Sequence, residues 1–340
     1  MTVLEAIQKS ADFLAKKGVE SPRLQTELLL AYLLKLPRMN LYLNFERALA
    51  PAEVDALREL VKRRGQREPL QHIIGSTSFC GLEIAVNRHA LVPRPETELL
   101  AELGWEFLAT IGQTPHPASG HPLPAGRGEG QGEGRALDFG TGTGCIAVAL
   151  AVKCPTAKIT ATDVSADALA LAKENAARHN VAERLEFLQG DGFSALQTVG
   201  QASCLSPSSS AASSGSRKSE TGWKPVLRFD LIISNPSYIP SAEIATLQPE
   251  VRDFDPRSAL DGGADGLDFY RLIASQAAAL LKPNGKVMLE FGDGQAGAIR
   301  QIFENEKWIV EAVKEDYSHR ARILVARASR PCHKRTWKVF

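Results

Sequence analysis

Short apolar segments alternate with longer amphipathic segments from residue 135 onward, and this alternation constrains the fold more than any other feature of the sequence. The segments with the length and β-branched content of strands are 135–139, 159–163, 185–189, 229–234 and 286–291. The segments of helical length are 146–152, 166–179, 267–281 and 295–304. Strands that alternate with helices form a doubly wound, largely parallel sheet, so the predicted fold class is α/β. Residues 308–313 and 322–326 are predicted to pair as an antiparallel edge of that sheet.

Length and charge narrow the class of protein further. A chain of 340 residues is long for one domain and favours two. Its 40 Lys and Arg residues nearly balance its 39 Asp and Glu residues, which leaves a net charge of +1. No overall basic field is therefore available to hold a nucleic-acid backbone, and we expect no direct binding to nucleic acid.

Cysteine usage and hydrophobic runs indicate where such a chain works. Its 5 cysteines include no Cys-x-x-Cys pair, which argues against a metal site and a disulfide framework and fits a reducing cytoplasm. Residues 1–17 lack the continuous apolar core of an export signal. The apolar run at 28–34 is much shorter than the ~20 residues that a membrane span needs. We expect a cytoplasmic protein with no metal and no membrane segment.

Residues 1–70 are predicted to form a small helical domain. Apolar residues recur there at helical spacing, Ser21 precedes Pro22 as an N-cap would, and Pro51 opens a further helix. Composition leaves two roles open for this domain, which either recognises a substrate protein or only packs against the rest of the chain.

Residues 71–98 are predicted to connect the two domains. The stretches with the pattern of short strands or a hairpin are 69–75, 79–81 and 84–86. In the proline-stiffened loop that follows, Arg94, Glu96 and Glu98 are candidates for lining a pocket. The alternative is that Thr97 and these acids cap and charge the helix that follows.

Two segments rich in Gly, Pro and Ser interrupt the α/β domain, at 112–134 and 198–222. Segments of this composition cannot bury a core, so we interpret both as flexible surface insertions. The last residues, 330–340, form a short basic tail. The expected organisation is a substrate-recognition domain at 1–70, a connecting hairpin or loop at 71–98 and the α/β domain at 99–329.

A polar turn follows the apolar segment 229–234. Proline disfavours helical backbone in the residue before it, so the Asn235-Pro236 step leads the chain out of the strand. The carboxyl ends of parallel strands are where open α/β sheets bind ligands. The side-chain oxygen of Asn235 and the carbonyl of Pro236 could each accept one N–H of a planar NH₂ group, on which Tyr238 could stack. The tetrapeptide alone is equally consistent with an ordinary structural turn.

A glycine-rich loop, Asp-Phe-Gly-Thr-Gly-Thr-Gly at 138–144, closes the first strand of the predicted sheet. Glycines let a ligand approach the backbone closely, and the absence of a Gly-Lys-Ser/Thr step argues against nucleotide hydrolysis. The spacing from Gly142 to Ala147 also fits a dinucleotide fingerprint, so the glycines alone leave NAD open. Asp163 ends the second strand, where a carboxylate can bind ribose hydroxyls, and Asp191 follows the third, where an adenine could lie.

These features together resemble a Rossmann-like S-adenosylmethionine-dependent methyltransferase. The chain more closely resembles the HemK/PrmC family, which methylates the side-chain amide nitrogen of a glutamine in peptide chain release factors. Further matching stretches are 69–71, 93–98, 259–263, 265–267 and 289–292. The resemblance covers about residues 1–326 apart from the two insertions. Its most specific part is the 93–98 stretch, Pro-Arg-Pro-Glu-Thr-Glu, whereas many methyltransferases share the glycine loop.

The resemblance implies a role for each matching residue. The residues expected to bind the cofactor S-adenosyl-L-methionine are Asp138, Gly140, Thr141, Gly142, Thr143, Gly144, Asp163, Asp191, Gly192 and Asn235. The expected catalytic residues are Asn235, Pro236 and Tyr238, which with Ser237 would form the substrate pocket. The implied substrate is the glutamine of the Gly-Gly-Gln loop of class I release factors, methylated on N5, which connects the enzyme to translation termination.

Four positions depart from the family pattern. The family usually has a second proline at Ser237, commonly an aromatic residue at Gly192, and often tyrosine at His72 and Cys80. The proposed pair of acceptors survives the change at 237, because it uses the asparagine side chain and the preceding carbonyl. We expect Phe193 to be able to supply the aromatic ring that position 192 lacks.

The implied methyl transfer requires alignment of the amide nitrogen, the methyl group and the sulfur, and it does not require a strong general base. A sulfonium methyl group is already activated, and an amide N–H becomes acidic only once its nitrogen carries positive charge. No histidine lies in a motif that would make it a base, so we interpret His72, His89 and His319 as structural.

Three alternatives stay open at this point. A similar Asn-Pro-x-Tyr turn serves adenine-N6 methylation of DNA, against which the near-neutral charge counts. A glutamine methyltransferase acting on a ribosomal protein would be chemically identical. A non-catalytic scaffold that retains the fold is disfavoured by the intact glycine loop and Asn235.

Overall fold

The structure is a computed structural model, and it describes residues 1–111, 133–196 and 228–329. The chain divides into two compact units, Met1–Val92 with Ala242–Leu260 and Pro93–Ser241 with Asp261–Phe340. The sequence predicts a helical domain at residues 1–70, and the first unit also includes residues 71–92 and 242–260. Apart from residues 133 and 134, the segments interpreted as insertions and the basic tail lie outside the described residues.

A seven-stranded sheet in the order β5-β4-β3-β6-β7-β9-β8 forms the second unit. Its strands are β3 (Arg135–Phe139), β4 (Lys158–Asp163), β5 (Leu185–Gln189), β6 (Phe229–Ser234), β7 (Leu281–Glu290), β8 (Trp308–Glu315) and β9 (Ala321–Ala328). Strands β5, β4, β3, β6 and β7 pair in parallel, and β9 pairs antiparallel with both β7 and β8. The predicted α/β sheet with an antiparallel edge is therefore confirmed.

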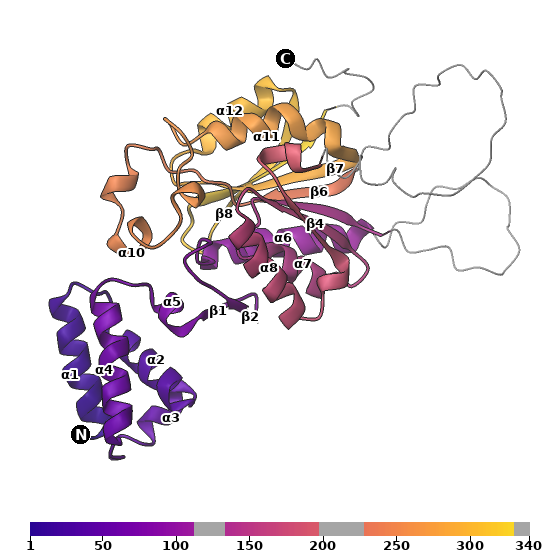
Figure 1. The fold of residues 1–340 in the computed structure, drawn as a ribbon. Coiled ribbons are helices and arrows are strands. Elements are labelled where there is room, and N and C mark those ends of the chain that lie inside the picture. The colour runs from indigo at the N-terminus through magenta and orange to yellow at the C-terminus, as the bar shows by residue number, and fades with distance from the viewer. Residues whose placement is uncertain (112–132, 197–227, 330–340) are drawn as a thin grey trace, which may run out of the picture. The chain divides into compact units, whose positions relative to one another are not determined.

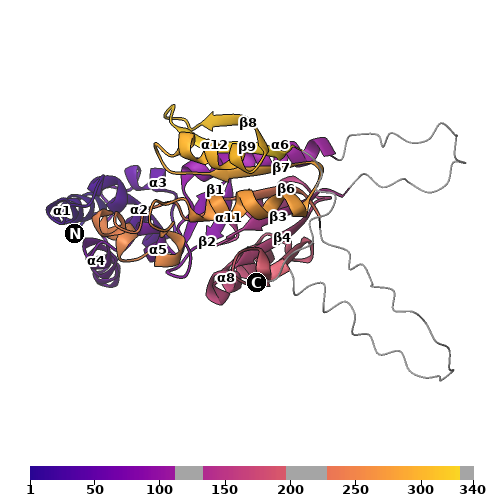
Figure 2. The same cartoon turned by 90° about the horizontal axis from the view of Figure 1, so that it is seen from above.

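Helices cover both faces of this sheet (Figure 1). They are α6 (Pro95–Ile111), α7 (Cys145–Lys153), α8 (Ala166–Arg178), α11 (Asp268–Gln276) and α12 (Ala296–Asn305), with short 3₁₀ turns η1 (Ala182–Arg184), η2 (Gly192–Leu196) and η5 (Ala277–Leu280). Helices α11 and α12 run side by side over one face, and α6, α7 and α8 lie on the other (Figures 1 and 2).

The sequence explains how α7 and α6 pack in this unit. Every residue of α7 from Cys145 to Ala151 is buried, as expected for an apolar helix packed inside the unit. Helix α6 approaches β6 closely at Gly104, where a Cβ atom would lie 2.9 Å from Cδ1 of Ile233. A side chain at this position would require the Ile233 side chain or the helix to move.

The strand register brings the ends of neighbouring strands to one edge of the sheet. Phe139 pairs with Thr162, and Ser234 pairs with Leu289. Strand β3 lies between β4 and β6, where the strand order reverses. Open α/β sheets bind ligands outside the carboxyl ends of their strands at such a switch point, so the loops after β3, β4, β6 and β7 are the candidate site.

The first unit contains a bundle of helices. They are α1 (Val3–Lys16), α2 (Pro22–Leu34), α3 (Arg38–Tyr42), α4 (Pro51–Gly65) and α5 (Leu70–Ile74). The core of this unit includes Ile7, Leu14, Leu29, Leu41 and Leu57, all at most 2% exposed. The helical prediction for this region is confirmed. Helix α1 begins with a capping box, in which the Thr2 side chain accepts the Glu5 N–H and the Glu5 side chain accepts the Thr2 N–H.

The prediction that Ser21 is the N-cap of α2, with Pro22 as the first helical residue, is confirmed. The Ser21 side chain makes no cap hydrogen bond, and its backbone is left-handed with a φ of 47°. One local expectation in this unit was wrong. Residues 70–74 form the helix α5 rather than a strand. A short apolar run cannot be assigned to helix or strand by periodicity alone. The hairpin itself is confirmed, with β1 (Ser76–Phe79) paired antiparallel to β2 (Leu82–Ala85).

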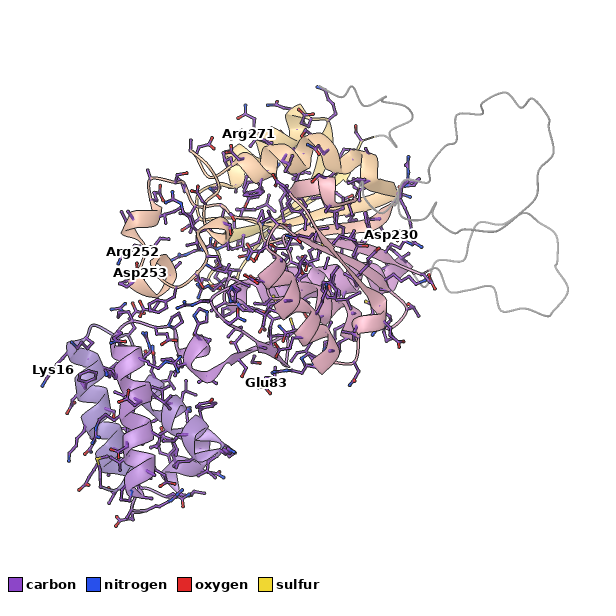
Figure 3. All side chains as sticks on the ribbon, in the orientation of Figure 1. Lys16, Glu83, Asp230, Arg252, Asp253 and Arg271 are labelled. Carbon is purple, nitrogen blue, oxygen red and sulfur yellow. The ribbon has the colours of Figure 1, made fainter. Side chains whose placement is uncertain are left out.

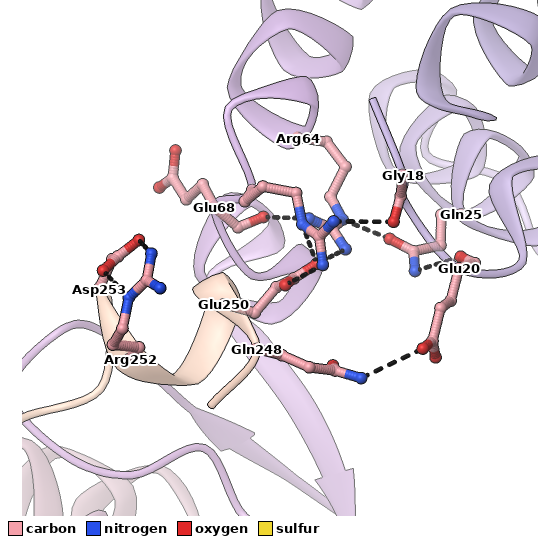
Figure 4. Close-up of polar contacts among 10 residues, drawn as sticks. Gly18, Glu20, Gln25, Arg64, Glu68, Gln248, Glu250, Arg252 and Asp253 are labelled. Atoms are coloured by element: carbon pink, nitrogen blue, oxygen red, sulfur yellow. Dashed lines mark hydrogen bonds and ion pairs between the residues drawn. The ribbon is translucent and has the colours of Figure 1, made fainter. Parts of the chain in front are cut away.

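An excursion of the chain after β6 also belongs to the first unit. Residues 242–260 contain the 3₁₀ turns η3 (Ile244–Thr246) and η4 (Arg257–Ala259) and the short helix α10 (Pro249–Arg252). Glu250 accepts hydrogen bonds from Nη2 of Arg64 at 2.7 Å and Nε of Arg67 at 2.8 Å (Figure 4). The amide of Gln248 also donates to Glu20. This excursion is thereby tied to α4 and the residues that follow it, which no local sequence pattern had indicated.

No helix in the described part of the chain is long and apolar enough to cross a membrane.

Candidate active site

The glycine-rich loop joins β3 to α7 through left-handed backbone. Gly140, Gly142 and Gly144 have φ values of 71°, 55° and 77°. At Gly144 a Cβ atom would also lie 2.8 Å from Cβ of Ala172 in α8, whereas at Gly140 nothing lies within 4 Å. The loop therefore requires glycine for its conformation, and it leaves open space beside residue 140 where a ligand could approach the backbone.

Asp138 lies in β3 just before its last residue, Phe139, and is fully buried. Its Oδ2 atom accepts the Thr141 hydroxyl at 2.6 Å and the Ala147 N–H at 3.1 Å. Its Oδ1 atom has no hydrogen-bond partner among the described residues. Burial raises the pKa of Asp138 to about 7, although these two hydrogen bonds oppose the shift. A buried carboxyl with an unused oxygen beside a glycine loop is suited to bind a positively charged ligand group.

Asp163 ends β4 and ties the glycine loop to the next strand. Its Oδ2 atom accepts the Gly142 N–H at 2.9 Å, and its Oδ1 atom accepts the Ser165 N–H at 2.9 Å. Each carboxylate oxygen can accept more than one hydrogen bond, so Asp163 retains acceptor capacity for hydroxyl groups. Its negative charge also raises the pKa of Asp138, which indicates that the two acids are close together.

The third acid lies after β5. Asp191 is exposed, and Gly192 has a φ of 57° with Leu272 3.1 Å from the position of its missing Cβ. Phe193 does not offer its ring to a ligand in place of an aromatic residue at 192. The ring is 6% exposed and packs against Phe139 with 4.8 Å between ring centroids, so it belongs to the core.

The polar turn after β6 is held from inside the second unit. Nδ2 of Asn235 donates to Oγ1 of Thr97 at 3.0 Å. Pro236 and Ser237 are buried, and Tyr238 is half-buried. Burial raises the pKa of Tyr238, and the negative charge of Glu290 acts in the same direction. The asparagine therefore uses the donor end of its amide internally, which leaves Oδ1 as the acceptor end.

The backbone of this turn is enclosed by glycines of the following loops. A Cβ atom at Gly262 would lie 2.7 Å from the carbonyl oxygen of Ser237, and one at Gly266 would lie 2.3 Å from that of Tyr238. Gln295 donates to the same Tyr238 carbonyl at 2.9 Å. The loops around Gly262 and Gly266 therefore pack directly against the backbone of the turn. A side chain at either glycine would displace the turn.

Two residues at this site were missed as functional candidates. Thr97 lies inside the first turn of α6, which begins at Pro95, so it is not the helix cap that the sequence suggested. Glu290 ends β7 beside Asn235, and both it and Thr97 are at most 3% exposed. Glu290 could have been found from the sequence in the same way as Asp163, because both are acids at the carboxyl end of a parallel strand.

The remaining residues of the 93–98 stretch divide between the two roles considered for it. Glu96 and Glu98 are acids in the first turn of α6, as expected for a helix start. Glu96 also raises the pKa of Tyr238, whereas Arg94 lowers it. Both charges therefore act on the turn as well as on the helix.

The histidines that we interpret as structural from the sequence include one on the surface and one in a helix of the first unit. His319 lies between β8 and β9, where its side chain is 90% exposed and 3.6 Å from Glu315. His72 lies in α5. Among the described residues no group of at least 3 His, Cys, Asp and Glu side chains could hold a metal ion.

The strand order, the glycine loop at the switch point and the Asn-Pro turn after β6 define a methyltransferase with a Rossmann-like sheet. Two family models match the sequence, the PrmC N-terminal domain over residues 5–75 and the methyltransferase small domain over residues 128–203. Curated relatives at 41% and 37% identity, each aligned over more than four fifths of its length, show that the chain belongs to the release factor glutamine methyltransferase family.

Curated relatives carry this assignment over most of the chain. The release factor glutamine methyltransferase of Geobacter sulfurreducens is 41% identical over 302 residues, which are 89% of this chain and 88% of that protein. The release factor glutamine methyltransferase of Chlorobaculum tepidum is 37% identical over 317 residues, which are 93% of this chain and 94% of that protein. Among solved structures, a methyltransferase from Pyrococcus furiosus aligns with a TM-score of 0.43 and 17% identity, over 78% of this chain and 97% of that chain.

Proposed function

We propose that this protein transfers a methyl group from S-adenosyl-L-methionine to the side-chain amide nitrogen of the glutamine in the Gly-Gly-Gln loop of class I release factors. The single observation that carries the proposal is the orientation of Asn235, whose amide nitrogen is bound inside the unit by Thr97. Its oxygen is therefore available as an acceptor at the carboxyl edge of the sheet. The names and the coverage of the curated relatives support the same substrate.

The residues at the sheet edge fit this cofactor. The unused Oδ1 of buried Asp138 suits the cofactor's ammonium group, and the open space at Gly140 admits its methionine end. Asp163 retains acceptor capacity for ribose hydroxyls. The other residues of the glycine-rich loop that we assign to cofactor binding are Thr141, Gly142, Thr143 and Gly144. Asp191 and Gly192 would lie beside the adenine of the cofactor. When bound, the cofactor supplies a methyl group that is already activated toward nucleophiles.

The turn after β6 would make the amide nitrogen a competent nucleophile. An amide nitrogen is a poor nucleophile because its lone pair is delocalised into the carbonyl. The Oδ1 of Asn235 and the carbonyl of Pro236 accept its two N–H bonds and stabilise the positive charge that develops as the new N–C bond forms. Tyr238 stacks on the planar amide and orients it. The methylated nitrogen then loses a proton to solvent, so no side chain has to act as a strong base.

The helical domain would recognise the release factor, which is the role we assign to residues 1–70. A release factor substrate also implies that the enzyme works in the cytoplasm, where translation takes place. The principal alternative is adenine-N6 methylation of DNA by the same turn. The net charge of +1 opposes it, because a DNA substrate requires phosphate contacts over a basic surface.

Incubation with labelled S-adenosylmethionine tests the proposal. Purified release factor, the same factor with its Gly-Gly-Gln glutamine replaced, a ribosomal protein extract and duplex DNA are the substrates to compare. We expect label only on the unmodified release factor, and peptide mass analysis should locate one methyl group on that glutamine. Label on DNA, or label that persists on the replaced factor, would exclude the proposed acceptor.

A further inference from the structure

Glu290 has surroundings that folding alone does not explain. It ends β7 at the same edge of the sheet as the turn after β6, and it is 3% exposed. Its carboxyl accepts hydrogen bonds from the side chains of Thr97 and Asn235, but its Oε2 atom has no hydrogen-bond partner among the described residues. A buried carboxyl that is only partly hydrogen-bonded costs stability, and such groups concentrate at functional sites.

The direction of the hydrogen bonds gives Glu290 its significance. An ionised carboxylate can only accept hydrogen bonds, so the Thr97 hydroxyl must point its hydrogen toward Glu290. The Oγ1 atom of Thr97 is then free to accept, and it does so from Nδ2 of Asn235 at 3.0 Å. Both neighbours of the Asn235 side-chain amide therefore present acceptors to its nitrogen. An amide turned by 180° would bring its oxygen against the carboxylate.

We propose that Glu290 is a positioning residue, whose carboxylate acts directly and through Thr97 to hold the Asn235 amide with its nitrogen inward and its oxygen toward the substrate amide. This inference rests on the proposed function, in which the oxygen of Asn235 accepts an N–H of the substrate glutamine. Replacing the carboxylate by an amide would allow either orientation at Asn235, because a glutamine side chain both donates and accepts.

Other charges around Glu290 determine when it is ionised. Burial raises the pKa of Glu290 to about 7, hydrogen bonds from Thr97 and Asn235 oppose the shift, Glu96 adds to it, and Arg322 opposes it. Tyr238 and Tyr270 also face this carboxyl, because its negative charge raises the pKa of each. Protonated Glu290 can donate, so the orientation of Asn235 should be lost as the pH falls through about 7.

The test compares Glu290→Gln, Thr97→Val and Thr97→Ser with the wild type in single-turnover methyl transfer to the release factor. Glu290→Gln and Thr97→Val should each slow the rate per cofactor-binding molecule by on the order of 10- to 100-fold, and Thr97→Ser should restore most of the rate that Thr97→Val removes. The double variant Glu290→Gln with Thr97→Val should be little slower than either of these single variants, because Glu290 and Thr97 act as one unit. At saturating cofactor, where titration of Asp138 does not limit binding, the wild-type rate should fall below about pH 7 and the Glu290→Gln profile should be flat there.

Tyr270→Phe is the matched control. The Tyr270 hydroxyl donates to the backbone carbonyl of Glu290 at 2.8 Å, so this variant loses a buried hydrogen bond to the same residue without changing its carboxyl. It should lower the melting temperature and keep the wild-type pH profile. Glu290→Gln with a wild-type rate and an unchanged acid limb, or additive losses in the double variant, would overturn the inference. If Asn235→Ala slows methylation but Glu290→Gln does not, this inference fails and the proposed function stands. If the wild type transfers no methyl group to the release factor, the proposed function itself is refuted.

Discussion

Nδ2 of Asn235 lies 3.0 Å from Oγ1 of Thr97, which stands 138 residues earlier in the chain. This hydrogen bond joins the turn after β6 to the first turn of α6, and both side chains belong to the second unit. The 93–98 stretch therefore contributes more than a helix start. One of its residues, Thr97, accepts a hydrogen bond from the amide nitrogen of Asn235, and the oxygen of that amide takes no part in this hydrogen bond.

Asp138 should make the stability of the protein depend on pH. Its pKa of about 7 lies above its usual value of 3.8, so the folded state binds a proton that the unfolded state has released. The resulting stabilisation is fully present below about pH 4 and is lost as the pH rises through about 7. Asp138→Asn keeps an acceptor for Thr141 and Ala147. It should reduce the change in the free energy of unfolding between pH 4 and pH 8 by up to about 4 kcal/mol. Urea unfolding from pH 4 to pH 8 measures it.

Glu290 supplies an internal comparison for that measurement. Its pKa is also raised to about 7, so it adds a slope of the same sign over the same pH range. Asp138→Asn should therefore reduce the slope, and the double change with Glu290→Gln should nearly abolish it. An unaltered slope in Asp138→Asn would mean that this carboxyl is ionised in the folded protein at neutral pH.

Gly262→Ala should damage the turn after β6. The added Cβ would lie 2.7 Å from the Ser237 carbonyl oxygen, so either the turn or the loop after it must move. We expect a loss of about 1 to 3 kcal/mol in the free energy of unfolding and slower methyl transfer. Gly297→Ala in α12 is the control, because nothing lies within 4 Å of its Cβ and alanine favours a helix. Equal effects of both changes would refute close packing as the cause.

Glu250 should hold the 242–260 excursion in place. Burial pushes its pKa up, but hydrogen bonds from Arg67 and Arg64 outweigh this and hold the pKa below its usual value. Glu250→Ala leaves Arg64, 3% exposed, without its carboxylate, and should cost about 2 to 4 kcal/mol of local stability. Hydrogen exchange over residues 242–260 should accelerate accordingly.

The same excursion offers a control for this prediction. Arg252 and Asp253 form an ion pair with side chains 40% and 48% exposed (Figures 3 and 4). Exposed pairs contribute about 0 to 1 kcal/mol, so Asp253→Ala should leave exchange nearly unchanged. If both variants accelerate exchange equally, Glu250 is not the anchor.

The parts of the fold that depend on local pattern were predictable, and the parts that depend on distant contacts were not. Alternating strand and helix patterns predicted the five parallel strands of the large sheet. Burial on both faces gives the central strands β3, β4 and β6 continuous runs of buried residues. Residues 70–74 were misassigned because five residues do not establish a period. The return of 242–260 to the first unit depends on Glu250 meeting arginines far away in the sequence, which no local pattern encodes.

The candidate site divides in the same way. The glycine loop, Asp163 and Asn235 are found from sequence, because each follows a strand and the carboxyl ends of parallel strands meet at one edge. The Thr97 and Glu290 contacts to Asn235 require the assembled sheet and α6. Phe193 was wrongly expected at the ligand, because the sequence does not show that its ring packs on Phe139.

Single-turnover methyl transfer by Asn235→Ala, with cofactor binding and thermal unfolding measured on the same sample, tests the central claim most directly. The variant loses the acceptor that is needed as the substrate nitrogen becomes positive. The account predicts a rate per folded, cofactor-bound molecule on the order of 10² to 10³ lower, about 3 to 4 kcal/mol. This loss should exceed any change in melting temperature or cofactor affinity that follows from losing the hydrogen bonds of Asn235 to Thr97 and Glu290. A folded, cofactor-binding Asn235→Ala protein that transfers methyl groups at the wild-type rate would contradict amide activation by this turn.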